Sequence, residues 1–149
     1  MAFDEGYQRL MMVGGQTADL SFTGSVSESC VLVGGQWVPL AFGIPWPISL
    51  TAMAYDSQRQ VMVAKAGSGL GPGVGAGGIF EWNGAWWTQQ HALSSLSSTA
   101  LAYDGARGVT RVFGGSIGPW FFPFSVPGST WTWNGTLAVQ TVTSASPPG

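Results

Sequence analysis

The sequence repeats itself, and this internal repeat constrains the fold more than any other feature. Residues 1–4 are Met-Ala-Phe-Asp, residues 53–56 are Met-Ala-Tyr-Asp, and residues 101–104 are Leu-Ala-Tyr-Asp. Each copy continues through a polar turn into an apolar run that ends at glycine, such as Leu-Met-Met-Val-Gly-Gly at residues 10–15. A period of about 50 residues is typical of proteins built from repeated supersecondary units. We therefore expect three such units.

A second segment of each copy predicts a hairpin. Residues 34–35, 83–84 and 134–135 are Gly-Gly, Asn-Gly and Asn-Gly, and each pair stands between two apolar runs. A two-residue hairpin loop needs positive φ at both central positions, which Gly and Asn adopt at the least steric cost. This alignment places Val33 of the first copy opposite Trp82 of the second. Each copy is thus predicted to hold four short strands.

The aspartate at the end of each Ala-aromatic pair predicts the turn between the first and second strands. Asp4, Asp56 and Asp104 can accept a hydrogen bond from the backbone two residues further on. The strands carry apolar residues on both faces, which is expected of a sheet stacked between two other sheets. The 23 glycines and nine prolines also favour an all-β body over long helices.

These motifs together resemble the kelch repeat, in the form common in bacterial multi-repeat proteins. The similarity covers the whole chain and is closest at residues 101–137 and in the second hairpin, residues 80–88. It implies an all-β fold of three four-stranded propeller blades, with no cofactor and a weak preference for an extracellular or surface location. The expected single unit, residues 1–149, divides into blades at about residues 1–50, 51–98 and 99–149.

Three blades form an incomplete ring, because propellers of this kind close with four to eight blades. The two outer blade faces are expected to be apolar, and such faces aggregate unless they are covered. Two copies joined head to tail around a twofold axis would complete a six-bladed propeller. A fragment of a larger propeller and an open filament are the alternatives.

Aromatic loops supply the candidate binding residues. Loops on a rigid scaffold commonly carry function, and Trp and Phe offer flat apolar surfaces to sugar rings or proteins. Lys65 and Arg111 are further candidates, because a charge within a strand must reach water or a partner. The predicted ligand- or partner-binding residues are Trp46, Lys65, Arg111, Trp120, Phe121, Phe122 and Phe124. The competing interpretation is that the aromatic loops cover the propeller or seal a contact between subunits.

Composition excludes several functional classes. Charged residues make up only 8% of the chain and the formal net charge is -2, which argues against a nucleic-acid partner. A single cysteine and a single histidine leave no set of metal ligands, so no metal is expected. Cys30 is predicted to be a buried small hydrophobe, and His91 a solvated loop residue. No apolar run approaches the length of a membrane span, about 18 residues.

The carboxylates lie mostly in turns and form no pair suited to glycoside hydrolysis, so no catalytic residue is predicted. The leading hypothesis is a non-catalytic kelch-type propeller module that self-associates through its open blade faces, chiefly as a homodimer, and binds partners through its aromatic loops. One alternative is a carbohydrate-binding, lectin-like propeller that uses Trp46 and Trp120 as stacking platforms. The other alternative is a fragment of a larger propeller enzyme, which rests on family analogy alone.

Overall fold

The described part of the chain is built from antiparallel β-sheets. The computed structural model describes residues 1–16, 25–41, 43, 50–67, 77–93, 99–117, 124–125 and 130–141. Within these residues there are three four-stranded antiparallel sheets, a two-stranded sheet and no helix. The predicted all-β fold with three four-stranded sheets is therefore confirmed.

Each large sheet takes its four strands from one copy of the repeat. The first sheet contains β1 (Ala2–Asp4), β2 (Arg9–Gln16), β3 (Ser25–Val33) and β4 (Gln36–Pro39). The second sheet contains β5 (Leu50–Asp56), β6 (Val61–Ala66), β7 (Gly78–Trp82) and β8 (Trp87–Ala92). The third sheet contains β9 (Ala100–Asp104), β10 (Val109–Phe113), β13 (Thr130–Trp133) and β14 (Ala138–Thr141). A hairpin that the sequence did not predict, β11 (Ser116–Ile117) and β12 (Phe124–Ser125), lies between β10 and β13 in the chain.

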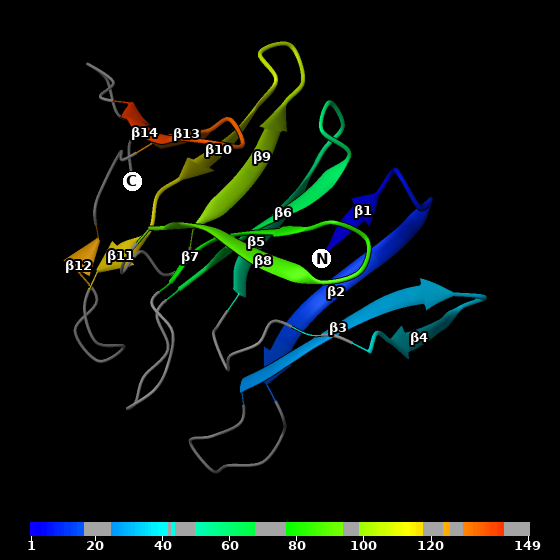
Figure 1. The fold of residues 1–149 in the computed structure, drawn as a ribbon. Helices are drawn as coiled ribbons and strands as arrows, with labels where there is room; N and C mark the ends of the chain where they lie inside the picture. The colour runs from blue at the N-terminus through cyan, green and yellow to red at the C-terminus, as the bar shows by residue number, and fades with distance from the viewer. Residues whose placement is uncertain are drawn as a thin grey trace.

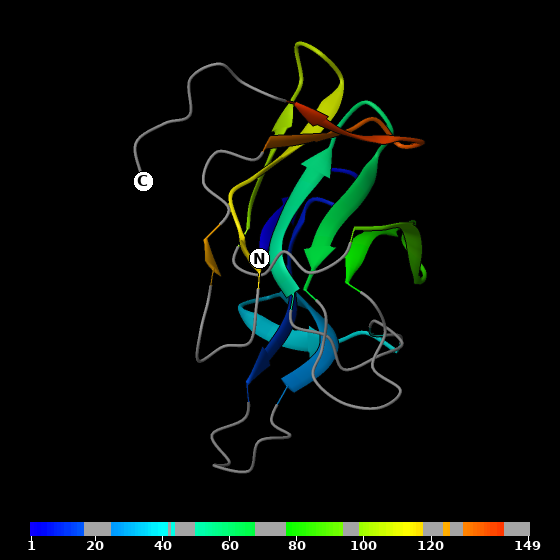
Figure 2. The same cartoon turned by 90° about the vertical axis from the view of Figure 1, so that its left-hand side faces the viewer.

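The second sheet lies between the other two, as Figures 1 and 2 show. Strand β5, the first strand of the second sheet, contacts both β1 and β9, which are the first strands of their own sheets. The first strands therefore lie side by side, and the later strands of each sheet fan outwards. This arrangement is compatible with propeller-like blades.

Strand β6 shows why the apolar pattern has no strict alternation. Its residues are buried from Met62 to Ala66, on both faces, because the sheet is covered on both sides. Met62 and Ala64 belong to one apolar cluster, and Val63 belongs to another. The expectation of apolar residues on both faces is confirmed for this strand.

The register corrects the predicted alignment of the hairpins by one residue. Leu32 pairs with Trp37, as Trp82 pairs with Trp87 and Trp133 with Ala138, so Leu32 rather than Val33 occupies the Trp82 position. The structural equivalents of Gly34 and Gly35 are therefore the residues at 84–85 and 135–136.

Backbone conformation explains why the hairpins align one residue away from the predicted position. Gly34 and Gly35 have φ of 58° and 80°, as a two-residue loop with two left-handed residues requires. In the second sheet Gly84 has a φ of 99°, whereas Asn83 is not left-handed. Asn83 instead accepts hydrogen bonds through Oδ1 from the N–H groups of Ala85 (3.0 Å) and Trp86 (3.1 Å). Its side chain, rather than a positive φ, makes the turn.

The aspartate turns form between the first two strands of each sheet. Asp56 Oδ1 accepts the N–H groups of Gln58 (3.1 Å) and Arg59 (3.0 Å), as the sequence predicted. Asp4 Oδ1 accepts the Tyr7 N–H at 3.2 Å. Asp104 pairs with the side chain of Arg107 at 2.9 Å, as Asp56 pairs with the side chain of Arg59 at 2.7 Å.

Candidate functional site

The surfaces between the sheets carry the most specific side-chain chemistry of the described residues. We call the face of a sheet that contacts the following sheet its trailing face, and the opposite face its leading face. Between the first and second sheets the contact is apolar, formed by Met11, Val13, Val31, Met62, Ala64, Ala66, Phe80, Trp82 and Trp87. A buried hydrogen bond also crosses this contact: Trp87 Nε1 of the second sheet donates to Ser29 Oγ of the first at 2.9 Å.

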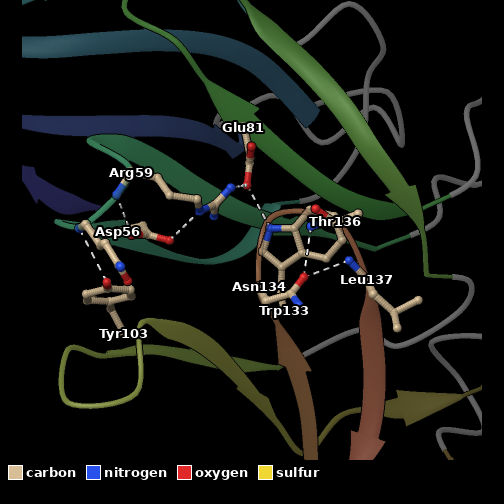
Figure 3. A network of polar contacts seen from close by, with 9 residues as sticks. Asp56, Arg59, Glu81, Tyr103, Trp133, Asn134, Thr136 and Leu137 are labelled. Carbon is tan, nitrogen blue, oxygen red and sulfur yellow. Dashed lines mark hydrogen bonds and ion pairs between the residues drawn. The ribbon is translucent and has the colours of Figure 1, made fainter.

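The contact between the second and third sheets has a polar network beside its apolar cluster (Figure 3). Arg59 donates through Nε to Asp56 Oδ2 at 2.7 Å and through Nη1 to Glu81 Oε1 at 2.6 Å. Glu81 Oε1 also accepts the indole N–H of Trp133 at 2.7 Å. Trp133 belongs to the third sheet, so Glu81 links the two sheets.

The charges of this network stabilise one another. Burial alone opposes the charge of Arg59, but the hydrogen bonds that it donates to Glu81 and Asp56 outweigh this effect and raise the pKa of Arg59 above its usual value. The guanidinium thus stays charged, and its hydrogen bonds to Asp56 and Glu81 hold it in place. This favours a structural role over acid–base chemistry.

A turn of one sheet covers the hairpin glycine of the next sheet at both internal contacts. A Cβ added to Gly84 of the second sheet would overlap the hydroxyl of Tyr7 from the first sheet. A Cβ added to Gly135 of the third sheet would overlap the guanidinium of Arg59 from the second. Tyr7 and Arg59 hold the same position in the turn after Asp4 and Asp56. Each contact therefore uses one turn side chain and one glycine.

A tyrosine near the first strands makes a second repeated contact. The hydroxyl of Tyr55 in the second sheet accepts a hydrogen bond from the backbone N–H of Gly6 in the first. The hydroxyl of Tyr103 in the third sheet likewise accepts the Gln58 N–H of the second, at 3.3 Å. The two internal contacts therefore share a tyrosine-to-turn hydrogen bond as well.

The outer two sheet faces lack such a covering among the described residues. Strand register places Phe3, Leu10, Met12, Cys30, Leu32 and Trp37 on the leading face of the first sheet. It places Ala102, Asp104, Arg111, Phe113 and Thr132 on the trailing face of the third sheet. Phe3 is 49% exposed and Trp37 is 40% exposed, whereas Trp87, the equivalent of Trp37 in the second sheet, is 5% exposed. The first of these faces is thus apolar and partly open to solvent. The second carries Asp104, Arg111 and Thr132, so the expectation of two apolar outer faces is confirmed only for the first.

Lys65 and Arg111, the two charged candidates, lie in β6 and β10 as predicted but in different surroundings. Lys65 is fully buried, and its Nζ donates to the carbonyl of Ala66 at 2.6 Å. Burial lowers the pKa of Lys65 to about 8. Arg111 contacts Asp104 at 3.6 Å and donates to Thr132 Oγ1 at 3.2 Å. The structure does not bring the two side chains together, because Lys65 faces the third sheet whereas Arg111 lies on the outer face of that sheet.

The aromatic candidates fall largely outside the described residues. These are Trp46, Trp120, Phe121 and Phe122. Phe124 begins β12, and its side chain is outside the described part of the chain.

Two other sequence predictions were wrong. Cys30 is half-buried rather than buried, because it lies on the partly open leading face of the first sheet. His91 lies in β8 rather than in a loop, and its ring centroid is 6.0 Å from that of Trp133. Packing between the second and third sheets therefore orders this histidine.

Sequence reasoning missed the residues that link the sheets, above all Tyr7, Arg59 and Glu81. The turn residues could have been found, because Tyr7, Arg59 and Arg107 each stand three residues after the aspartate of their copy. Glu81 gave no such signal, since Val31 and Thr132 hold its position in the other sheets.

No family model matches the chain, and no curated protein is significantly similar to it. Among the described residues, no cluster of His, Cys, Asp or Glu has the arrangement of a metal site. The same residues include no helix with the length and hydropathy needed to cross a bilayer. The candidate site is the pair of open sheet faces, as their strand register and exposure define it.

Proposed function

We propose that this protein is a non-catalytic, kelch-type β-propeller module that assembles through its open sheet faces. One observation carries the proposal: the two outer faces are equivalent, by strand register, to faces that are buried inside the chain. Trp37 illustrates the match, because its counterpart Trp87 is almost fully buried against the preceding sheet. Burying an apolar side chain of this size contributes about 2 kcal/mol, which favours association of such faces.

The mass of the protein in solution tests this proposal. We expect sedimentation or light scattering to show a species of about twice the 15.6 kDa chain mass, in exchange with monomer at low concentration. A larger assembly would still support association through open faces. A soluble monomer at all concentrations up to about 100 μM would contradict it, since contacts of ordinary size give micromolar affinity or better.

Partner binding through the aromatic loops is the second part of the proposal, and its support is the sequence. Trp46 and Trp120 stand among prolines, which limit the conformational entropy lost when a loop binds. A glycan array and a pull-down with Trp120→Ala as the control would test this part. Loss of a bound partner in the variant is expected, and equal binding by both forms would contradict it.

A further inference from the structure

We propose that the leading face of the first sheet docks on the trailing face of the third sheet of a second copy, repeating the contacts that join the sheets within one chain. This inference rests on the proposed self-association and specifies which surfaces meet. It excludes pairing of two first sheets or of two third sheets. Two kinds of contact support it: each occurs twice inside the chain, and at the outer faces its two partner groups remain separate.

The first such contact is between a hairpin glycine and a turn side chain. Gly84 and Gly135 are each covered by a side chain from the turn of the preceding sheet. Gly34, their equivalent in the first sheet, has nothing within 4 Å of an added Cβ. The side chain that holds the covering position in the third sheet is Arg107, and it is 68% exposed. A second copy brings Arg107 over Gly34 by the geometry that places Arg59 over Gly135.

The second such contact is between a tyrosine ring and the turn of the preceding sheet. Tyr55 and Tyr103 each bond the backbone of the turn that belongs to the preceding sheet. Phe3 holds this position in the first sheet and is half exposed. The turn residue that it would meet is Ala106 of the third sheet, which is exposed. The ring can pack there as the tyrosines do, but it has no hydroxyl to make the hydrogen bond.

The apolar part of the two faces also matches. Phe113 is the equivalent of Val13 and Lys65, which are buried between sheets, yet Phe113 is 39% exposed. Opposite it, the second copy would present the leading face that carries Trp37. Burial of both rings removes apolar surface from water on each side of the contact.

The charged residues of the third sheet are suited to the same contact. Asp104 is paired with Arg107, and this hydrogen bond is the main reason that the pKa of Asp104 is lowered. The equivalent pair, Asp56 and Arg59, is already covered at the contact between the second and third sheets, where Asp56 is fully buried. A paired carboxylate can therefore enter such a contact without leaving an unpaired charge.

Two complementary variants test which faces meet. Trp37→Glu alters the leading face, and Phe113→Glu alters the trailing face, both at partly exposed positions. Because every contact in the proposed arrangement uses one face of each kind, each variant alone should be monomeric at concentrations where the wild type is dimeric. Their equimolar mixture should regain a heterodimer, since it contains one unaltered contact. Native mass spectrometry distinguishes the three species, and circular dichroism verifies the folding of each variant.

The outcomes separate this inference from the proposed function. A monomeric wild type overturns both. If the wild type is dimeric and either variant alone is equally dimeric, like faces meet, so the inference is wrong while self-association stands. The same holds if both variants are monomeric and folded but their mixture yields no heterodimer.

A second test looks for tighter dimerisation, so it does not depend on disrupting the contact between the two copies. Phe3→Tyr supplies the missing hydroxyl at both contacts of the dimer and should tighten dimerisation about four- to hundredfold, the effect of one added hydrogen bond at each contact. Tyr103→Phe is the matched control, because it removes the equivalent hydroxyl within the chain and should leave the dimer affinity unchanged. Unchanged or weaker dimerisation of folded Phe3→Tyr would contradict the inference.

Discussion

At the residue scale, single side chains decide how neighbouring sheets recognise each other. Glu81 accepts hydrogen bonds from Arg59 of its own sheet and Trp133 of the next. Val31 holds the position of Glu81 in the first sheet, and an alkyl group cannot accept a hydrogen bond. Accordingly Trp82 Nε1, the counterpart of Trp133 Nε1, is buried with no hydrogen-bond partner. Both internal contacts thus bury a tryptophan at this position, but only the contact between the second and third sheets supplies an acceptor for its indole N–H.

Replacing Glu81 is expected to weaken the contact between the second and third sheets. Glu81→Ala should lower the free energy of unfolding by about 2 kcal/mol, because it leaves Arg59 Nη1 and the Trp133 indole N–H without their shared acceptor. Glu81→Gln should cost about half as much, since its amide oxygen can still accept both bonds but carries no charge to pair with Arg59. Urea unfolding at fixed protein concentration measures both. Glu28→Ala, at an exposed position, is the control and should change little.

Lys65 makes stability depend on pH in a defined direction. Its pKa in the fold is about 8, against 10.5 when exposed, so the fold disfavours the charged amine. Below about pH 8 the cost of burying the charge is fully present, and it is relieved as pH rises towards 10.5, because the unfolded chain then binds more protons.

Lys65→Met, which replaces the amine by an unbranched apolar side chain one atom shorter, removes that cost. We expect the variant to be more stable than the wild type at pH 7 by about 2 to 3 kcal/mol, less any loss of the hydrogen bond to Ala66. The difference should narrow between pH 8 and pH 10. Urea unfolding of both proteins across this range measures it, and a constant difference would show that Lys65 does not titrate as inferred.

At the scale of the element, the hairpins explain how one repeat tolerates different sequences. The first sheet turns through Gly34 and Gly35, both left-handed. The second and third sheets turn through one left-handed glycine and an asparagine side chain, Asn83 or Asn134, that accepts two backbone N–H groups. Either solution joins strands whose facing residues are five positions apart, so the register of the sheet is preserved.

Asparagine is therefore expected to matter through its side-chain oxygen. Asn83→Ala should lower the free energy of unfolding by about 1 kcal/mol, because two backbone N–H groups lose their acceptor. Asn83→Asp retains an acceptor oxygen at the same place and should stay close to the wild type. Thermal unfolding followed by circular dichroism measures both variants. A loss equally large in Asn83→Asp would show that the acceptor is not the important feature.

At the scale of the whole molecule, the second sheet is covered on both sides, whereas each outer sheet is covered on one side among the described residues. If association covers the outer faces, folding and assembly are linked, and stability depends on protein concentration. We expect the midpoint of thermal unfolding to rise by about 2 °C for each tenfold increase in concentration. Differential scanning calorimetry measures this shift. Trp37→Glu should abolish the dependence, and its persistence in that variant would argue against the leading face as the contact.

The sequence by itself determined the period, the four strands of each copy and the all-β class, because turns depend on local backbone preferences that Gly, Asn and Asp reveal. It also identified Lys65 and Arg111 as charges within strands. It misjudged the hairpin register by one residue, which moved Leu32 off the Trp82 position. Local turn signals alone do not fix which residues pair across strands.

Only the tertiary structure decided which side chains meet between sheets. Glu81 bonds Trp133, more than 50 residues away, and Tyr7 covers Gly84 at an even greater separation in the chain. Such contacts depend on how sheets stack in space, which no periodic pattern encodes. The same stacking left Gly34 uncovered and Arg107 exposed, because no sheet lies beyond the outer faces among the described residues.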